Sequence, residues 1–319
     1  MTEVSDAKRL PTDPKVSVVV ITYRQEHVLA EAVDSIAAQR TDFSFEIIVA
    51  EDCSPDRTRE AALATQRKYP ALVRVVFTDA NKGMNRNFRF ALGLARAPLI
   101  ALCEGDDVWL DREKLHRQVM ALEQNTDVDL AITRGYRLYA DGRRELDWDY
   151  GEVARRLTVE QLFASAGQAA PSASLLWRAT ATHDLPRWFD DAGFGDLLLI
   201  LATSARGGAM YDPAPAVGYR VAQPTSFTAW FDGISLKRRI DHLNEAERLL
   251  KLACAHYRVD PSVMRERFHD FHYSIAQWQL RRRRPLAALE AFARMDPGLT
   301  IEKAGKRLRR LATLGSVRR

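Results

Sequence analysis

Several features that would assign this 319-residue sequence to a common protein class are missing. Its three cysteines are scattered and show no zinc-binding spacing, so neither a disulfide framework nor a zinc site is expected. No apolar run reaches the roughly 18 residues of a membrane-spanning helix. The polar start, MTEVSDAKRLPTDP, lacks the apolar core of a signal peptide. We therefore expect a protein of the reducing cytoplasm that meets a membrane only peripherally, at the inner face of the cell membrane.

Glycine-rich phosphate loops are absent as well. The first predicted strand is followed by TYRQEH rather than G-x-G-x-x-G, and no G-x-x-x-x-G-K-[ST] occurs. A classical dinucleotide fold and a kinase-like loop are therefore excluded. A divalent cation held by one or two carboxylates could bridge the phosphates of a nucleotide instead.

Charge is unevenly distributed along the chain. Residues 236–319 contain 20 Lys and Arg against 9 Asp and Glu, a balance of +11, whereas residues 1–235 contain 27 against 33, a balance of −6. Such a split predicts regions with different partners. We expect a polar tail over 1–13, a catalytic domain over 14–234 and a basic helical extension over 235–319.

Strand and helix patterns alternate over the first 135 residues. Apolar runs rich in β-branched residues predict strands at 16–22, 45–50, 72–77, 98–103 and 128–133. Helical spacing fills the intervals, and Ser54-Pro55 predicts the start of the second helix. This alternation predicts a Rossmann-like α/β fold with a mostly parallel sheet flanked by helices.

The rest of the chain is less regular. Strands are expected at 172–177 and 217–221, with a helix starting near Asp196. From Ser235 onward the pattern is helical, with breaks near Pro261, Pro285 and Pro297.

Polar side chains follow the predicted strands at the carboxyl end of each. In such sheets, ligands bind beyond these ends. The segments are Thr22-Tyr23, Glu51-Asp52-Cys53-Ser54, Asn81-Lys82-Gly83 and Glu104-Gly105-Asp106-Asp107. Three close carboxylates in the last segment repel one another unless a cation or hydrogen-bond donors offset them. Their hard oxygens suit Mg²⁺ or Mn²⁺, although an ordinary acidic turn is the alternative.

Five segments together resemble the family 2 glycosyltransferases, which have the GT-A fold. They are VSVVVITYRQ, EIIVAEDCSPDRT, NKGMNRNFRFAL, PLIALCEGDDVW and FGDLLL, in the family's order and spacing over residues 14–232. The EGDDVW form with the later FGD is most similar to the bacterial branch that builds surface polysaccharides. The resemblance implies transfer of a sugar from a nucleotide diphosphate donor, a UDP-sugar by preference, with inversion at the sugar. It implies a glycan or lipid-linked saccharide as the acceptor.

The resemblance also implies residue roles. Thr22, Tyr23 and Asp52 would line the pocket for the base, and Asp106 would hold the ribose side. Asp107 would bind Mn²⁺ or Mg²⁺ between the phosphates. Lys82 is a candidate phosphate contact, with a solvated loop lysine as the equal alternative.

Asp196 matches the later acid that acts as catalytic base in inverting members of the family. Its apolar neighbours Phe194 and Leu197 would raise its pKa, which suits a base. One departure concerns the metal: Tyr219-Arg220-Val221-Ala222 lacks the histidine that many members have after this Tyr-Arg pair.

Simpler explanations exist for single residues. Asp52 could cap the helix after Pro55, Asp196 could be a helix N-cap, and Trp109 could be ordinary packing. Arg86 and Arg89 are expected to be solvated rather than bound to phosphate.

The basic C-terminal helices could simply cover the catalytic domain with their charges in solvent, and two other roles are considered. They could contact an anionic membrane surface, whereas nucleic-acid binding is not expected because no nucleic-acid motif accompanies the charge. Two alternatives to a glycosyltransferase are a non-catalytic glycan-assembly scaffold and a sugar-1-phosphate nucleotidyltransferase. The latter needs a glycine- and arginine-rich loop where the chain has TYRQEH.

Overall fold

The computed structural model describes residues 1–164, 168–221, 230–231 and 233–300, which form two compact units. The first unit comprises residues 1–162 and 168–233, and the second comprises residues 163–167 and 234–319. The division at 233/234 lies beside the boundary predicted at 234/235. No helix of the described residues is both long enough and apolar enough to cross a membrane.

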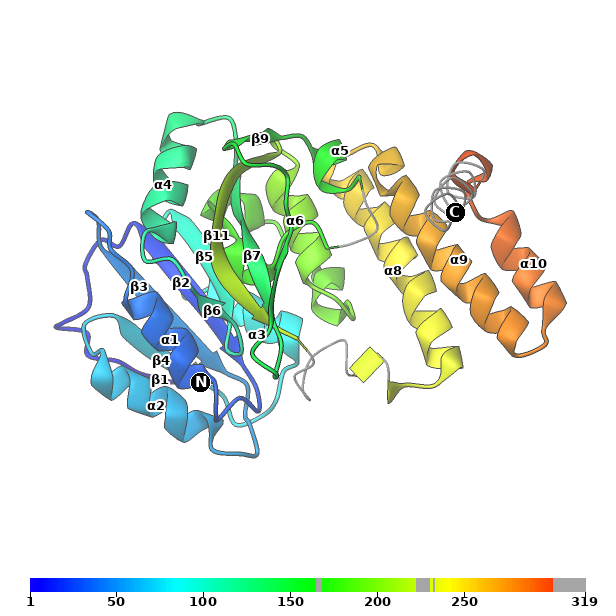
Figure 1. Ribbon diagram of the computed structural model, residues 1–319. Coiled ribbons are helices and arrows are strands. Elements are labelled where there is room, and N and C mark those ends of the chain that lie inside the picture. Colours follow the sequence, from blue (N-terminus) through cyan, green and yellow to red (C-terminus); the bar gives the residue numbers. More distant parts are fainter. Residues whose placement is uncertain (165–167, 222–229, 232, 301–319) are drawn as a thin grey trace, which may run out of the picture. The chain divides into compact units, whose positions relative to one another are not determined.

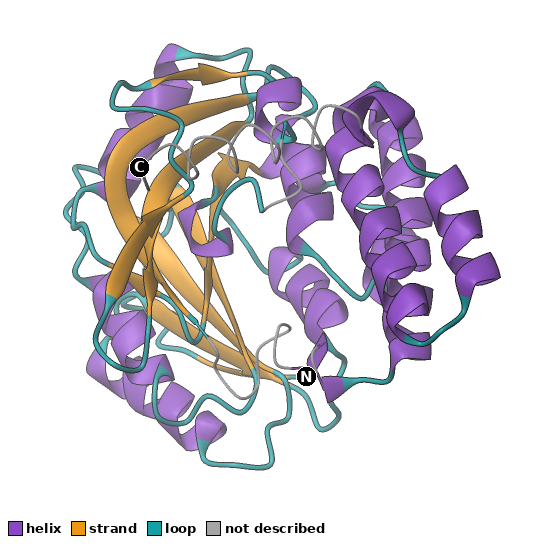
Figure 2. Cartoon of the chain, turned by 45° about the vertical axis from the view of Figure 1, so that its right-hand side comes forward, coloured by secondary structure: helices purple, strands orange, loops and turns teal. Residues whose placement is uncertain are grey.

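The first unit is built on one mixed sheet (Figures 1 and 2). Along the sheet the strands follow the order β1-β4-β3-β2-β5-β10-β7-β11-β6, while β8 pairs with β7 and β9 with β11. The strands are β1 Thr2–Val4, β2 Val16–Thr22, β3 Phe45–Glu51, β4 Val73–Phe77, β5 Leu99–Glu104, β6 Val108–Trp109, β7 Leu130–Leu138, β8 Arg144–Asp147, β9 Arg155–Leu157, β10 Leu176–Arg178 and β11 Ala209–Arg220.

Parallel pairing confirms the predicted βαβ core. Strands β4, β3, β2 and β5 are parallel neighbours, and β7 pairs in parallel with β11. All residues of β2 and β3 are buried, as continuous β-branched runs predict for strands covered on both faces. The Asp141-Gly142 turn joins β7 to the antiparallel β8, with Gly142 at φ 85°.

Helices cover both faces of this sheet. They are α1 Leu29–Ala37, α2 Thr58–Lys68, α3 Met84–Leu92, α4 Lys114–Gln124, α5 Val159–Leu162 and α6 Asp196–Ser204. Residues of α1, α2 and α4 share one apolar cluster with alternate residues of β2, whereas α3 contacts β2 and β3 outside that cluster. Helix α3 therefore lies on the opposite face, consistent with Figure 1.

The second unit is helical. Helix α8 spans Leu236–Tyr257, α9 spans Arg265–Arg281 and α10 spans Pro285–Ala293. Ser235 caps α8 by accepting a hydrogen bond from the backbone N–H of Arg238, and Pro285 occupies the first turn of α10. The predicted breaks near Pro261 and Pro285 are confirmed.

Three local predictions need correction. Helix α2 begins at Thr58 rather than after Ser54, because the Asp56 carboxylate accepts the Thr58 N–H (3.1 Å) while the Ser54 hydroxyl accepts the Arg24 N–H (3.1 Å). The strand expected at 172–177 is a 3₁₀ turn over Ser172–Ser174 followed by β10. Residues 2–4 of the segment expected to be a tail form β1.

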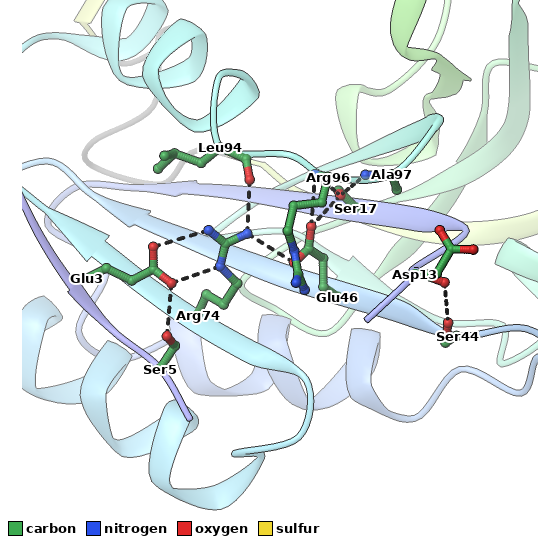
Figure 3. A network of polar contacts seen from close by, with 10 residues as sticks. All are labelled: Glu3, Ser5, Asp13, Ser17, Ser44, Glu46, Arg74, Leu94, Arg96 and Ala97. Carbon is green, nitrogen blue, oxygen red and sulfur yellow. Dashed lines mark hydrogen bonds and ion pairs between the residues drawn. The ribbon is translucent and has the colours of Figure 1, made fainter. Parts of the chain in front are cut away.

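A buried charge network lies at the amino-terminal end of the parallel strands, away from the predicted site (Figure 3). The Glu46 side chain is fully buried, and its carboxylate accepts hydrogen bonds from Ser17 (2.7 Å), Arg74 (3.0 Å) and Arg96 (2.9 Å). Arg74 also donates to Glu3 of β1. Burial alone would raise the pKa of Glu46, but hydrogen bonds from Arg96 and Ser17 and the charge of Arg74 hold it below its usual value.

Candidate active site

Parallel register brings the predicted site residues to one edge of the sheet. Thr22 pairs with Glu51 and Ile21 pairs with Glu104, so β2, β3 and β5 end together. The backbone N–H of Asp52 donates to the Thr22 carbonyl at 3.1 Å. The expectation that the polar segments converge is therefore confirmed for these three strands.

The acidic loop after β5 folds back tightly against the end of β2. The N–H of Gly105 donates to the Ile21 carbonyl (3.0 Å), and that of Asp107 donates to the Glu104 carbonyl (3.0 Å). A Cβ at Gly105 would overlap the amide oxygen of Gln25 and lie 2.8 Å from the Thr22 hydroxyl. Only glycine fits this approach, which explains the G of EGDD.

Asp107 is the most unusual carboxylate of the loop. It is 1% exposed, and its Oδ2 atom is buried without a hydrogen-bond partner among the described residues. Burial raises its pKa well above the usual value, and the charges of Asp106 and Glu104 raise it further. The Arg220 charge and backbone N–H oppose this rise. An orphaned buried acceptor of this kind is costly unless something binds it.

The two neighbouring carboxylates share this environment. Burial, the charge of Asp106 and the charge of Asp196 raise the pKa of Glu104 to about 7, against a hydrogen bond from Ser172. Burial also raises the pKa of Asp106, although Arg220 and Gln25 act in the opposite direction. Asp196 thus lies near enough to the cluster to act on it electrostatically.

Arg220 contacts the acidic loop directly. It ends β11, donates to the Asp106 carbonyl at 2.6 Å and pairs with Glu31 at 2.6 Å. It therefore holds the backbone of the loop, in addition to the effect of its charge and backbone N–H on Asp107.

The acidic loop fits a divalent cation that takes one or two ligands from the protein and the rest from a bound nucleotide and water. Among the residues that the structure describes, no three His, Cys, Asp or Glu side chains are grouped to hold a metal by themselves. Mg²⁺ and Mn²⁺ sites for nucleotides need only one or two carboxylates, because phosphate oxygens and water complete the shell. The unpartnered oxygen of Asp107 suits such a role. Position 222, where the histidine of other members is missing, lies outside the described residues.

Asp52 lies at the predicted base pocket and also organises it. Its two carboxylate oxygens accept the backbone N–H groups of Lys82 (2.8 Å) and Gly83 (2.9 Å), and its carbonyl accepts the Asn81 amide (2.8 Å). The suggestion that it caps the helix after Pro55 is wrong, since it fixes the loop before α3 instead. Each oxygen retains a second lone pair for a ligand.

The other nucleotide candidates differ in exposure. Thr22 is 3% exposed and donates its hydroxyl to the Gln25 amide oxygen (2.7 Å), whereas Tyr23 is 39% exposed beside it. The Lys82 ammonium donates to the Thr78 hydroxyl (2.6 Å) and lies 4.9 Å from the Phe90 ring centroid. A phosphate contact by Lys82 would require it to leave this position.

Asp196 is the first residue of α6 and is half-buried. Its oxygens accept the Gln168 amide (2.9 Å) and the N–H of Leu197 (2.8 Å). The N-cap position of α6 is Gly195, but the Asp196 carboxylate accepts an N–H of the first turn, so helix capping remains an alternative role for it.

Helix α3 holds the loop that leads to Asp196, which sequence analysis did not anticipate. The buried Asn85 amide donates to the carbonyls of Phe189 (2.8 Å) and Ala192 (2.9 Å). A Cβ at Gly195 would lie 2.5 Å from the Asn85 amide oxygen, so the loop packs directly on this side chain.

Two arginines of α3 reinforce the same loop. Arg89 pairs with Asp190 and donates to the carbonyls of Leu185 and Pro186 (2.8 Å each), and Arg86 pairs with Asp191. The expectation of simple solvation is wrong for Arg89, whose side chain is only 32% exposed, whereas Arg86 is 57% exposed and pairs with Asp191 at the surface. Because the start of α3 is bonded to Asp52, one helix connects the two halves of the site.

Trp109 packs rather than presenting a stacking surface. It is 4% exposed, its indole N–H donates to the Ala173 carbonyl (2.9 Å), and the Lys114 ammonium lies 4.0 Å from its ring centroid.

Comparison with known proteins decides the family. The profile described as glycosyl transferase family 2 matches residues 17–178, which contain the whole edge from Thr22 to Asp107. This chain is a family 2 glycosyltransferase. The predicted membership of that family is confirmed.

The relatives of this family 2 glycosyltransferase are longer than the region in which they align with it. It is 37% identical over 148 residues to the uncharacterized protein Rv1520 of Mycobacterium tuberculosis, covering 46% of this chain and 43% of that one. It is 25% identical over 214 residues to the succinoglycan biosynthesis protein ExoO of Rhizobium meliloti, covering 65% and 60%. The chain thus spans less than half the length of the mycobacterial relative.

Solved structures show the fold. The Staphylococcus aureus TarS fragment 1–349 in complex with UDP-GlcNAc superimposes with a TM-score of 0.62 at 19% identity, over 82% of this chain and 73% of that one. The mannosyltransferase PcManGT of Pyrobaculum calidifontis, in complex with GDP-Man and Mn²⁺, gives 0.57 at 17% identity, over 93% and 80%. The GT-A fold predicted for this family 2 glycosyltransferase is confirmed.

Proposed function

We propose that this glycosyltransferase moves a sugar from a nucleoside diphosphate sugar to an acceptor hydroxyl, with inversion and with a divalent cation. The observation that carries the proposal is the unpartnered, buried oxygen of Asp107 within three mutually repelling carboxylates. A cation bridging a diphosphate would give that oxygen a partner and relieve the repulsion.

The donor is proposed to lie along the edge formed by β2, β3 and β5. Thr22, Tyr23 and Asp52 would line the base pocket, and Asp106 would bind the ribose. Lys82 would approach a phosphate. Two structural neighbours were solved with UDP-GlcNAc and with GDP-Man, which supports a nucleotide sugar without fixing the base. UDP is our first choice.

The chemistry divides between the two halves of the site. A Mn²⁺ or Mg²⁺ bound at Asp107 would stabilise the negative charge that develops on the leaving diphosphate. Asp196 would accept the proton of the acceptor hydroxyl as that oxygen attacks the anomeric carbon from the face opposite the leaving group. Attack from that face inverts the anomeric centre. Asn85, through the loop to Gly195, would keep Asp196 in position.

The acceptor is proposed to be a glycan or a lipid-linked saccharide of a bacterial surface polysaccharide. A relative named as a succinoglycan biosynthesis protein supports this class. Such acceptors would place the enzyme at the cytoplasmic face of the cell membrane, in contact with anionic lipid through its basic C-terminal helices. Part of this basic region, with Lys303, Lys306, Arg307, Arg309 and Arg310, lies outside the described residues.

Calorimetry tests the donor site directly. UDP, GDP and dTDP are each titrated into the protein with Mn²⁺ and with EDTA, using the wild type, Asp107→Asn and Asp141→Asn. Asp141 is an exposed hairpin residue whose carboxylate accepts the Arg143 N–H and lies outside the acidic loop, so its variant removes the same charge elsewhere. We expect one nucleotide to bind in a metal-dependent manner, with binding lost in Asp107→Asn and kept in Asp141→Asn.

The opposite result has a clear meaning. If folded wild-type protein binds none of the three nucleotides with metal, the transferase proposal fails and the non-catalytic scaffold becomes the leading function. If binding occurs but Asp196→Asn transfers sugar as fast as the wild type, Asp196 is not the base.

A further inference from the structure

Helix α10 buries its small residues and exposes its large apolar ones, which is the reverse of what a helix that only completes a core would do. Its small residues Ala288 and Ala291 are buried, at 0% and 5% exposure. Its large apolar residues point outward, with Leu286 76% exposed, Leu289 61% and Phe292 38%. Single exposed apolar side chains are common, but three of them on adjacent turns of one helix form a patch that marks an interaction surface.

Four consecutive arginines adjoin this apolar face. Arg281–Arg284 connect α9 to α10, and all four are exposed. Within the described residues none of them forms an ion pair, whereas Arg265 of the same unit is paired with Asp296. Leu280, just before them, is 49% exposed. The hairpin tip therefore combines uncompensated positive charge with exposed apolar surface.

A groove extends the positive surface from the hairpin to the start of α8. It encloses about 520 Å³ and is lined by Lys237, Gln279, Arg282 and Arg284 among others. The Gln279 amide oxygen is buried there without a partner in the described part of the chain. The groove thus has three cations against the single carboxylate of Asp241, and this net positive lining, with the unpartnered Gln279 oxygen, suits an anionic head group that also carries hydroxyls.

We propose that the α9–α10 hairpin is a docking surface for an anionic membrane. Leu286, Leu289 and Phe292 would enter the boundary between head groups and acyl chains, and Arg281–Arg284 would bind anionic head groups. A second copy of this chain is a poorer occupant, because two such arginine clusters brought together would repel. The proposal deepens the proposed function by assigning its membrane contact to described residues. Lipid binding itself does not depend on sugar transfer.

Vesicle sedimentation with the full chain tests the surface. Vesicles of phosphatidylcholine alone are compared with vesicles containing about a third phosphatidylglycerol, at low and high salt. We expect binding to the anionic vesicles only, weakened by salt through screening.

Paired variants divide the surface into its two components. Arg281→Gln with Arg283→Gln should weaken binding about 25-fold, at roughly fivefold per arginine. Leu286→Gln with Leu289→Gln should weaken it about tenfold per leucine. The matched controls are Arg112→Gln with Arg144→Gln, both exposed in the first unit, and Leu252→Gln, 40% exposed on α8. The controls should bind like the wild type, and unchanged thermal unfolding should show that each variant is folded.

Three outcomes would overturn the proposal. One is equal binding to neutral and anionic vesicles, and another is an equal loss in the control variants. The third is a dimer in lipid-free solution that Leu286→Gln with Leu289→Gln dissociates, which would assign the apolar face to a second copy. Calorimetric nucleotide binding of the hairpin variants separates this proposal from the transferase proposal, since each can fail while the other stands.

Discussion

The buried lysine of helix α4 gives a quantitative test of the packing beneath the acidic loop. Lys114 is fully buried, and its ammonium donates to the Gln118 amide oxygen (2.8 Å). The ammonium also lies 4.0 Å from the Trp109 ring centroid. Burial lowers the pKa of Lys114 from 10.5 to about 7. We predict that Lys114→Met, which has a similar volume and no charge, stabilises the protein at neutral pH.

The magnitude follows from two opposing terms. A lowering of that size corresponds to a penalty of about 5 kcal/mol for burying the charged form. Replacement by Met leaves the Gln118 amide oxygen without its donor, which costs about 1–3 kcal/mol. The expected net gain in the free energy of unfolding is therefore about 2–4 kcal/mol at pH 7 and below.

The gain should disappear as pH rises. Between about pH 7 and 10.5 the unfolded state binds more protons at Lys114 than the folded state, so wild-type stability rises with pH in this window. In the variant this contribution is missing. Near pH 10 the loss of the hydrogen bond should make Lys114→Met equal to the wild type or less stable.

Urea unfolding at pH 6, 7.5 and 9, followed by tryptophan fluorescence, measures the difference. Lys8→Met, at an exposed lysine, is the control and should show no comparable trend with pH. A stability difference for Lys114→Met that stays constant from pH 6 to 9 would refute the reasoning, because the buried charge would then not be its source.

Three further predictions concern the framework of the site. Glu46→Ala should lose about 1.5–3 kcal/mol at pH 7, because Arg74 and Arg96 lose their shared buried acceptor while Arg74 keeps Glu3 as its acidic partner. Because the wild-type pKa of Glu46 is lowered, the loss should shrink as pH falls below about 4.5, as urea titrations at several pH values would show. Asn85→Ala should lower the free energy of unfolding by about 1–3 kcal/mol, since two backbone carbonyls lose their donor. It should also speed hydrogen exchange in residues 189–195, and unchanged exchange would contradict the proposed support of that loop. Gly105→Ala should weaken nucleotide binding in calorimetry at least tenfold by displacing the acidic loop from Thr22, and wild-type affinity would show that the close approach does not matter.

Much of the fold follows from pattern because its strands are buried on both faces. Runs such as Val16–Thr22 leave little choice of structure, and parallel strands must then bring Thr22, Asp52 and Asp107 to one edge. The start of α2 was mispredicted because Ser54 has good local capping chemistry, yet tertiary contact with Arg24 occupies its hydroxyl.

The support of Asp196 could not be predicted from local pattern. The Asn85 amide binds carbonyls 104 and 107 residues away, and no periodicity in the sequence encodes such a pairing. Similarly, the unpartnered oxygen of Asp107 becomes visible only when every neighbouring donor is placed. A sequence pattern predicts which carboxylates lie close together, whereas the structure shows which of their oxygens lacks a hydrogen-bond donor.

The three-residue strand β1 has a practical consequence for handling the protein. It pairs antiparallel with β4 and occupies the outer edge of the sheet, where Glu3 also binds Arg74. Without it, the backbone groups of β4, whose residues Val73, Val75 and Val76 are fully buried, would face solvent as a template for pairing with another molecule. A trim of the first five residues would therefore invite aggregation even though the edge that carries the candidate site is untouched.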